Sequence, residues 1–280
     1  MPGSAPDSVI TRALAEDVGS GDVTTDAIVP ADLRGSADVV VREAGVICGL
    51  DQAFAVLLEL DPTARIELLA QDGDRIEHPP QVVARLHASL RALLTGERTA
   101  LNLLQRMSGI ATTTRRYADL VAGTGVQLLD TRKTAPGLRA LDKHAVACGG
   151  GTNHRAGLHD AVLIKDNHVA VAGGVAAAVE RVRLRHPGRP VEVEVDTLDQ
   201  LQQALAAGAD VILLDNMPPA QLRRAVATTA GRARLEASGS ITTDTIREVA
   251  ETGVDAISVG ALTHSVRALD IALEVPPSAS

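Results

Sequence analysis

The chain has 280 residues, 45% of them hydrophobic and 22% charged, which is enough for one large or two modest globular domains with a buried core. Aromatic residues make up 1% of the chain, so the core must be aliphatic, and a row of base-stacking rings is excluded. The formal net charge of -8 excludes a global basic field that would attract nucleic acid or an anionic membrane.

The first 105 residues predict a mixed α and β region. Short β-branched runs, turn-rich dipeptides and one long apolar periodicity carry this prediction. In chain order we expect a hairpin of 39–41 with 46–48, a helix over 53–60, strands at 66–69 and 81–86, and a helix carrying Leu94, Leu101, Leu104 and Met107 on one face.

From residue 126 short apolar strands alternate with helical stretches. The expected strands are 126–129, 161–164, 191–195, 211–214, 234–236 and 256–259, with a doubtful seventh at 145–148. The last four of the six begin 20 to 23 residues apart, as βα units of a parallel sheet do. The stretch 198–207 is one such helix, and Gly208 is placed to end it.

The number of these units favours an incomplete barrel. A full eight-unit α/β barrel usually needs about 200 residues or more. The segment Val126–Thr263 supplies 138, so we expect an α/β fold with an incomplete barrel of six or seven strands. An open doubly wound sheet is the alternative. The domain boundary is expected near residue 105, giving an N-terminal domain 1–105 and a catalytic domain 106–265.

Cysteine usage and the absence of targeting signals favour a soluble, cytoplasmic protein. Cys48 and Cys148 lie 100 positions apart without a CxxC motif, which is typical of buried thiols in a reducing compartment. The N-terminus lacks a basic stretch followed by an apolar run, so no signal peptide is expected. The longest apolar stretch, 169–179, is too short to span a bilayer, so no membrane partner is expected.

Polar residues or a glycine lie at the ends of all six strands. After a single strand, solvated loop residues would be the preferred interpretation. Because the carboxyl ends of parallel strands converge on one face, six such segments in series favour a binding site instead. The residues concerned are Asp130 to Lys133, Lys165 to His168, Glu194 with Asp196, Asp215 with Asn216, Ser238 with Gly239, and Gly260.

One part of this site has the composition of an anion-binding segment. Residues 126–165 contain six Lys or Arg against three Asp, in a chain that is acidic overall. Arg offers a planar fork for carboxylate or phosphate, and the glycines at 149–151 allow backbone N–H groups close to an anion. No Walker loop, complete GxGxxG or zinc-type Cys/His spacing accompanies them.

The two acids of interest are Glu194 and Asp215. Glu194 lies inside an apolar strand, where an unpaired charge is costly. Two interpretations stay open at this point: a structural ion pair with Lys165 or Arg155, or a carboxylate that faces the cleft.

The residues resemble those of the quinolinate phosphoribosyltransferase family, also called nicotinate-nucleotide pyrophosphorylases (carboxylating). The resemblance runs through nearly the whole chain in the family's order. It rests on 16–17 with 21–25, Glu97 to Asn102, Asp130 to Thr134, Gly149 to Arg155, 163–168, 192–195, 214–216 and Val259 to His264.

This resemblance implies a homodimer in which the N-terminal α/β sandwich of one subunit covers the incomplete barrel of the other, with a higher assembly left open. Residues 266–280 would pack back on the sandwich. The reaction would join quinolinate to phosphoribosyl pyrophosphate (PRPP), releasing pyrophosphate and CO2 and leaving nicotinate mononucleotide for NAD biosynthesis. Mg²⁺ would arrive bound to PRPP rather than in a cage of protein side chains.

The resemblance also implies roles for individual residues. Quinolinate would be bound by Thr131, Arg132, His154, Arg155 and Lys165, with Arg98 contributed by the neighbouring subunit. Lys133 would bind PRPP near the departing pyrophosphate, and Ser238, Gly239, Ser240, Gly260 and His264 would cradle its 5-phosphate. Glu194 and Asp215 would hold ribose hydroxyls, so that Lys133, Lys165, Glu194 and Asp215 form the catalytic set.

One departure from the family pattern concerns the phosphate cradle. Ser240 stands where the family usually has a second glycine, and Ala237 where it often has a second serine. A related PRPP-dependent transferase that acts on another pyridine or aromatic carboxylate is therefore the alternative. A catalytically dead binding dimer is disfavoured, because a mere binder has no need of Glu194 and Asp215.

Overall fold

The computed structural model describes residues 8–275 and divides them into two compact units. The first unit comprises 8–113, 135–149 and 266–275, and the second comprises 114–134 and 150–265. Residues 276–280, which were expected to pack on the first domain, lie outside the described part of the chain. None of the described helices combines the length and apolar character needed to cross a bilayer.

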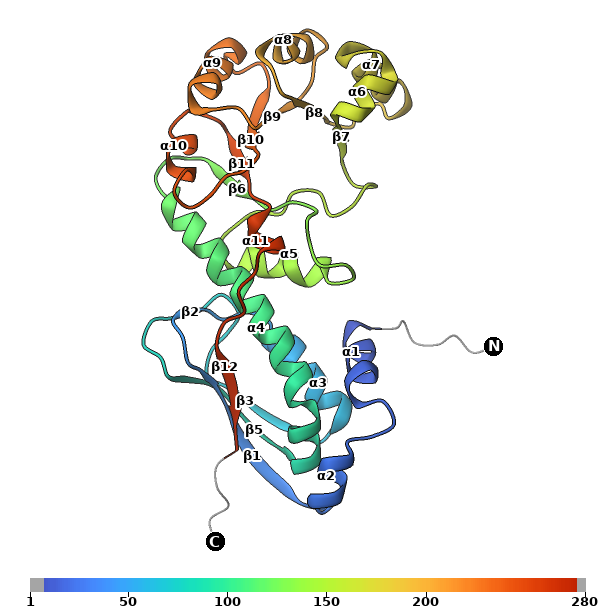
Figure 1. Cartoon of the computed structure of the whole chain (residues 1–280), viewed down its shortest axis with the longest axis vertical. Coiled ribbons are helices and arrows are strands. Elements are labelled where there is room, and N and C mark those ends of the chain that lie inside the picture. The colour runs from blue at the N-terminus through green and yellow to red at the C-terminus, as the bar shows by residue number, and fades with distance from the viewer. Residues whose placement is uncertain (1–7, 276–280) are drawn as a thin grey trace, which may run out of the picture. The chain divides into compact units, whose positions relative to one another are not determined.

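The first unit is built on antiparallel strands with helices on one side (Figure 1). A four-stranded sheet has the order β12-β1-β5-β3, and β2 pairs with β4. The elements are α1 (Val9–Val18), α2 (Val23–Ile28), β1 (Arg34–Val41), β2 (Gly45–Val46), α3 (Leu50–Leu60), β3 (Arg65–Leu68), β4 (Arg75–Ile76), β5 (Gln81–Ser89), α5 (Arg139–Cys148) and β12 (Ile271–Glu274). Helix α4 (Leu90–Leu120) contributes residues to both units.

Two predictions for this unit are wrong. The runs 39–41 and 46–48 form no hairpin, because β1 pairs with β5 and β12, while β2 pairs with β4. A short apolar run does not specify its partner, and here the partners lie far away in sequence. The doubtful strand at 145–148 is the last turn of α5, since periodicity alone does not separate so short an apolar run from a buried helix.

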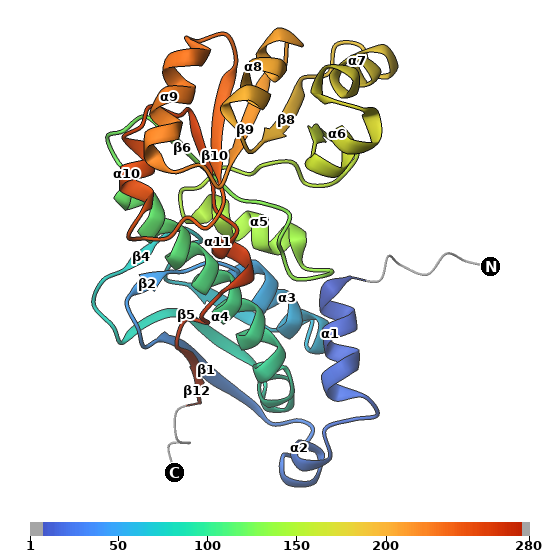
Figure 2. The same ribbon diagram turned by 45° about the horizontal axis from the view of Figure 1, so that its top comes forward.

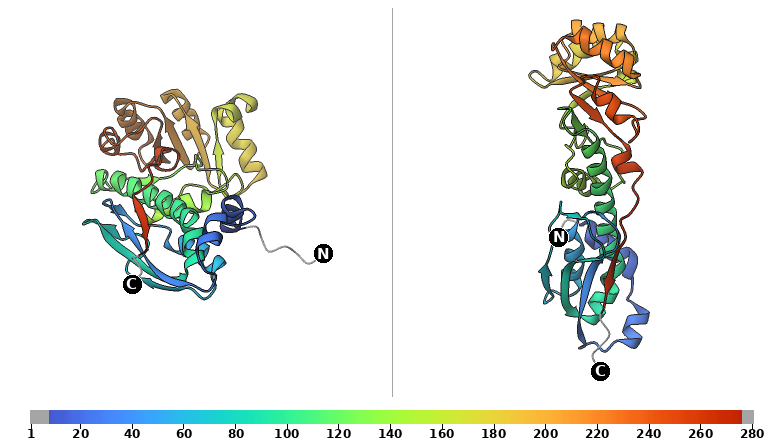
Figure 3. Two further views of the ribbon diagram at one scale, coloured as in Figure 1. Left: turned by 60° about the horizontal axis from the view of Figure 1, so that its bottom comes forward. Right: turned by 90° about the vertical axis from the view of Figure 1, so that its left-hand side faces the viewer.

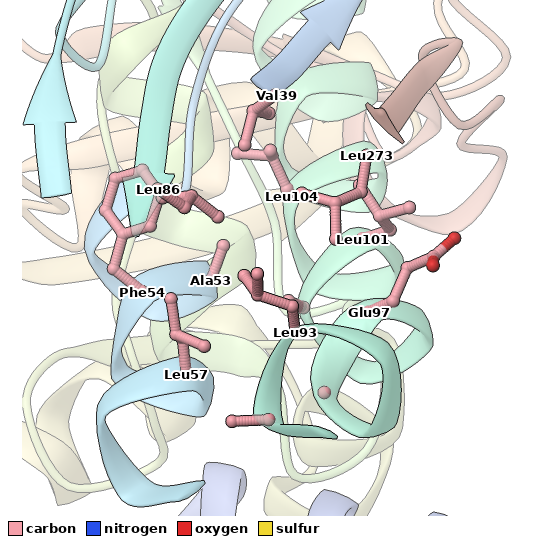
Figure 4. Close-up of a pocket in the computed structure, with 13 residues that line it drawn as sticks. Val39, Ala53, Phe54, Leu57, Leu86, Leu93, Glu97, Leu101, Leu104 and Leu273 are labelled. Carbon is pink, nitrogen blue, oxygen red and sulfur yellow. The ribbon is translucent and has the colours of Figure 1, made fainter. Parts of the chain in front are cut away.

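The core of the first unit is aliphatic, as the composition requires. Helices α3 and α4 cover one face of the four-stranded sheet (Figure 3). Figure 4 shows leucines of α4 facing Ala53 and Phe54 of α3, with Glu97 pointing away from them. Leu104 is 1% exposed, and burial of such a side chain contributes about 1.5–3 kcal/mol. The hollow that remains is only about 30 Å³, so the core is closely packed.

The second unit is a parallel sheet of six strands with helices along its outer side (Figure 2). Its strands are β6 (Gln127–Leu129), β7 (Val162–Ile164), β8 (Val191–Val195), β9 (Val211–Asp215), β10 (Arg234–Ser238) and β11 (Ala256–Ser258). Its helices are α6 (Asp166–Ala172), α7 (Val175–Arg185), α8 (Leu198–Ala206), α9 (Pro219–Thr229), α10 (Ile246–Ala250) and α11 (Ala261–His264).

The six predicted strands of this unit are confirmed, and they form an incomplete barrel. The sheet order is β6-β11-β10-β9-β8-β7, which leaves β6 and β7 at its two edges. The barrel is therefore open between them. Local signals explain the repeating units: at the start of α8, for example, Thr197 accepts a hydrogen bond from the Gln200 N–H (3.2 Å), and Gly208 follows the helix with φ +74°.

Candidate active site

Strand alternation sorts the side chains of the second unit into two faces. In β8, Val191, Val193 and Val195 are all buried, and the two glutamates between them point to the opposite face. The register puts Glu194 beside Leu213 of β9 and Leu213 beside Glu236 of β10. The inner face of the incomplete barrel thus carries carboxylates among aliphatic side chains.

A hollow of about 250 Å³ opens at the carboxyl ends of these strands. Its lining includes nine of the residues proposed from the sequence, drawn from six segments of chain. The lining residues are Asp130, Thr131, Arg132, Lys133, His154, Arg155, Leu163, Lys165, Glu194, Leu213, Asp215, Glu236, Ser238 and Ser258. The convergence of the strand ends, predicted from the βα pattern, is therefore observed.

Two guanidinium groups share this hollow. Burial lowers the pKa of Arg155, and the nearby positive charge of Arg132 lowers it further. The Arg155 guanidinium donates to the Ala161 carbonyl at 3.4 Å, which accounts for a single one of its donors. Like charges held this close repel each other, and an anionic ligand between them would relieve that repulsion.

Glu194 satisfies both interpretations that the sequence left open. Its carboxylate lies 3.3 Å from the Lys165 ammonium, and it also lines the hollow. The Glu194 side chain is 16% exposed, whereas that of Lys165 is 48% exposed. Asp215 lies one strand further on, and its carboxylate accepts a hydrogen bond from the Asn216 side-chain amide at 2.7 Å. Both acids are therefore oriented by neighbours and remain at the surface of the hollow.

Sequence reasoning missed two buried acids beneath His154. The Nε2 atom of His154 lies 3.2 Å from Glu192 and 3.5 Å from Glu236, and these carboxylates raise the pKa of His154 to about 10. Burial in turn raises the pKa of Glu192. The alternation of β8 was the available signal, since it places Glu192 on the same face as Glu194.

Hydrogen bonds from backbone N–H groups to side chains fix the loop that carries His154. The His154 N–H donates to the Asp130 carboxylate at 2.8 Å, and the Arg155 N–H donates to His154 Nδ1 at 2.7 Å. The second bond requires an unprotonated Nδ1, so it opposes the cationic form that the two glutamates favour. The geometry holds the ring with its Nε2–H aimed at the glutamates. Arg155 is thereby positioned by the same contacts.

The residues expected to cradle phosphate lie at the ends of β10 and β11. Ser238 lines the hollow, and Gly239 follows it with φ +98°. A Cβ on Gly239 would overlap the Asn216 side chain, so only glycine fits this turn. Ser240 has φ +50°, a left-handed conformation that costs a side chain about 1–2 kcal/mol.

Gly260 and His264 complete that set. A Cβ on Gly260 would lie 3.0 Å from Lys133 Cδ and 3.1 Å from the His264 ring, so glycine permits the close approach of both side chains. The Thr263 hydroxyl donates to the Lys133 carbonyl at 2.8 Å and fixes the backbone there. Gly239, Ser240, Gly260 and His264 lie outside the lining of the hollow itself.

Arg98 also lies outside the lining of this hollow. It lies in α4 and belongs to the first unit. The second unit on its own therefore provides a hollow lined by four Lys or Arg side chains together with Glu194 and Asp215, and the turn at Gly239 follows the lining residue Ser238. Such a set can bind an anionic aromatic carboxylate beside a phosphorylated sugar.

Comparison with family models matches both parts of the chain. The model of the quinolinate phosphoribosyl transferase N-terminal domain matches residues 22–108, and that of the C-terminal domain matches residues 110–274. A curated nicotinate-nucleotide pyrophosphorylase [carboxylating] of Mycobacterium leprae is 49% identical, covering 95% of each chain. A probable nicotinate-nucleotide pyrophosphorylase [carboxylating] of Bacillus subtilis is 43% identical, covering 95% of this chain and 92% of its own.

Solved structures agree with these matches. The structure titled NadC from Streptococcus pyogenes has a TM-score of 0.92 at 39% identity and covers 98% of both chains. The nicotinate-nucleotide pyrophosphorylase from Francisella tularensis has a TM-score of 0.91 at 42% identity, covering 97% of this chain and 98% of its own.

Proposed function

The chain belongs to the quinolinate phosphoribosyl transferase family, and we propose that it transfers phosphoribose from PRPP to quinolinate with decarboxylation. The products are nicotinate mononucleotide, pyrophosphate and CO2, which places the enzyme in NAD biosynthesis. One observation supports this most directly. Arg132 and Arg155 share a hollow with Glu194 and Asp215, so groups for a dicarboxylate and groups for a sugar cation lie together.

The arginines suit the aromatic substrate. Quinolinate carries two adjacent carboxylates, and guanidinium forks bind such groups with paired, charge-assisted hydrogen bonds. We assign Arg132 and Arg155 to this role, supported by Thr131 at the same strand end. His154 orients Arg155 through the backbone contact described above. The ring nitrogen would then be held in line with the anomeric carbon of PRPP.

The acids suit the sugar. As the bond from the anomeric carbon to pyrophosphate breaks, positive charge grows on the sugar ring, and Glu194 and Asp215 would stabilise it. Lys133 would stabilise the negative charge that collects on pyrophosphate. The ring nitrogen then forms its bond to the anomeric carbon. Loss of the 2-carboxylate as CO2 leaves the electron pair of the broken bond on carbon 2, where the adjacent positive ring nitrogen stabilises it. A proton from water then binds to this pair and forms the C–H bond at carbon 2.

Magnesium enters this proposal as part of the substrate. Mg²⁺ prefers oxygen ligands and keeps several waters, so it suits PRPP better than an all-protein site. Among the described residues of the second unit, the only three potential metal ligands whose ligand atoms lie within 4.8 Å of one another are His154, Glu192 and Glu236, and His154 already contacts both glutamates. Glu194 and Asp215, the acids assigned to the sugar, carry carboxylate oxygens, which are the type of ligand that Mg²⁺ prefers.

The direct test is product formation. The purified protein is incubated with quinolinate, PRPP and Mg²⁺, and nicotinate mononucleotide is sought by mass spectrometry together with one equivalent of pyrophosphate. Omission of each reactant serves as the control. Turnover of quinolinate supports the proposal, and a failure to consume it with all three reactants present refutes it.

Ser240 motivates the second candidate, a transferase for a different pyridine or aromatic carboxylate. Its side chain adds bulk at the end of β10, close to the proposed phosphate cradle. Kinetics with quinolinate and nicotinate side by side distinguish the two functions. Preference for nicotinate would favour the alternative, and it would displace quinolinate as the substrate.

We further propose a homodimer with a shared active site, in which Arg98 reaches the hollow of the partner subunit. The support is that Arg98 belongs to the unit that does not carry the hollow, while the family resemblance gives it a substrate role. Arg98→Ala and Lys165→Ala subunits would each be inactive alone, and their mixture would recover part of the activity. Mixed subunits that exchange yet stay inactive would refute the sharing.

We propose that the protein is located in the cytoplasm. Cys48 and Cys148 are free thiols, which is the form that a reducing compartment maintains.

A further inference from the structure

Four potential metal ligands meet in the first unit, whereas the hollow described above belongs to the second. They are Cys48 before α3, Asp72 between β3 and β4, and His144 and Cys148 on α5. One ligand atom from each, two sulfurs, one nitrogen and one oxygen, lies within 4.8 Å of the others. His144 and Cys148 are four positions apart, so they share one face of their helix.

Two of the three distances between neighbouring ligand atoms match a tetrahedral site. With Zn–S of about 2.3 Å and Zn–N or Zn–O of about 2.1 Å, tetrahedral angles put S···N and S···O both at about 3.6 Å and N···O at about 3.4 Å. Cys148 Sγ lies 3.5 Å from His144 Nε2, and Cys48 Sγ lies 3.6 Å from Asp72 Oδ2. The His144 Nε2 to Asp72 Oδ2 distance is 3.0 Å, the hydrogen-bonded length.

The arrangement is unsuited to a nucleophilic relay. A Cys–His–Asp relay uses both ring nitrogens of the histidine, one toward the thiol and one toward the carboxylate. Here a single atom, His144 Nε2, faces both Cys148 and Asp72. Ligand atoms that converge on one point are typical of a metal site instead.

Supporting contacts orient the ligands. The other oxygen of Asp72, Oδ1, accepts hydrogen bonds from the N–H groups of Gly49 (2.9 Å) and Leu50 (3.1 Å), which leaves Oδ2 directed at the cluster. The Ser108 hydroxyl bonds both the N–H and the carbonyl of Cys48, at 3.0 and 3.1 Å. Outer contacts of this kind fix ligating side chains in metal sites.

We propose that Cys48, Asp72, His144 and Cys148 bind one zinc ion as a structural site of the first unit. Two thiolates, an imidazole and a carboxylate form a donor set that favours zinc over magnesium or calcium. All four positions are filled by protein, so the site is closed and has no vacancy for catalysis. The His144 side chain is 49% exposed and gives the ion an entry path.

Such a site would join three segments that are distant in sequence. The residues before α3, the turn between β3 and β4 and helix α5 would be tied to one ion. Zinc would therefore raise the thermal stability of the protein without being part of the reaction.

The test uses the full chain, stripped with a chelator under reducing conditions and then supplied with zinc. Elemental analysis after gel filtration is expected to find one zinc per chain. Cobalt in place of zinc is expected to give the intense visible absorption of a tetrahedral site, with sulfur-to-cobalt charge transfer. Competition with a chromogenic chelator then measures affinity.

Matched variants locate the ion. His144→Ala and Cys148→Ser are expected to lower zinc affinity at least about 100-fold and to abolish the zinc-dependent rise in melting temperature. His87→Ala, another exposed histidine of the same unit, is the control and should bind like the parent. Circular dichroism checks that each variant is folded. The proposal is overturned if the parent takes up no zinc, if the two ligand variants bind as tightly as the control, or if rapid thiol trapping finds Cys48 and Cys148 joined as a disulfide.

Discussion

Replacement of Glu194 by glutamine isolates the charge that we assign to the sugar cation. Glutamine keeps the size of the side chain and removes its negative charge. Because the side chain lines the hollow and is 16% exposed, water screens it only in part. The change should therefore slow the chemical step while the fold persists.

The size of the effect follows from the charges involved. Two unit charges about 4 Å apart interact by about 4 kcal/mol at the effective dielectric constant of about 20 that suits partly buried sites. Lys165, 3.3 Å from the same carboxylate, offsets part of this interaction, although it is half exposed. A net loss of about 2–4 kcal/mol corresponds to a decrease in kcat of about 30- to 900-fold.

Stability provides the contrasting measurement. An ion pair with one half-exposed partner contributes about 0–1 kcal/mol, so Glu194→Gln should change the free energy of unfolding by less than about 1 kcal/mol. Steady-state kinetics and urea denaturation are measured on the same preparations, with Glu180→Gln on the surface of α7 as control. A variant within about threefold of the parent kcat would refute the charge argument.

The double variant separates the two roles of the pair. If Lys165 acts mainly by holding Glu194, then Lys165→Met should cost little activity once Glu194 is already glutamine. If Lys165 contacts substrate independently, the two losses should multiply. A structural pair alone would show a different pattern, with nearly unchanged kcat in both single variants and in the double variant.

Three further predictions concern stability. Ser240→Gly should raise the free energy of unfolding by about 0.5–1 kcal/mol in urea denaturation, since it relieves a positive φ, and a loss would contradict this. Asp142 is fully buried and accepts two hydrogen bonds from Arg106, at 2.9 and 2.7 Å, so Asp142→Asn should cost about 3 kcal/mol in the same assay, and under 1 kcal/mol would show the pair to be dispensable. Hydrogen bonds from Thr63 and other groups lower the pKa of Asp61 to about 2, below its ordinary 3.8, so its stabilising effect is present above pH 3.8 and is lost as pH falls toward 2. Asp61→Asn should therefore flatten that part of the stability profile, and an unchanged slope would refute the assignment.

The sequence predicted the second unit well because its signals are local and repeated. Most of its β-strands contain short Val/Ile/Leu runs and lead into polar residues or a glycine, and parallel topology alone places those residues together. The first unit gave weaker signals. Its sheet pairs β1 with β5 and β12, so the pairing depends on segments that lie far apart, and no run of residues specifies its own partner.

The same limit explains which site features were missed. Glu192 could have been predicted from the sequence, because alternation along β8 places it on the inner face beside Glu194. The contact of Glu192 with His154 could not have been predicted, since it joins a loop to a strand almost 40 positions away.

The thiol–histidine–aspartate cluster shows the limit most clearly. Its ligands come from positions 48, 72, 144 and 148, and the only close spacing is the pair on α5. Spacing rules recognise zinc sites whose ligands arrive as two close pairs. A site assembled from one pair and two isolated residues exists only after three segments have folded together. Its ligands therefore resembled two buried cysteines, an ordinary histidine and a turn aspartate, and only the distances between atoms distinguish a metal site from that description.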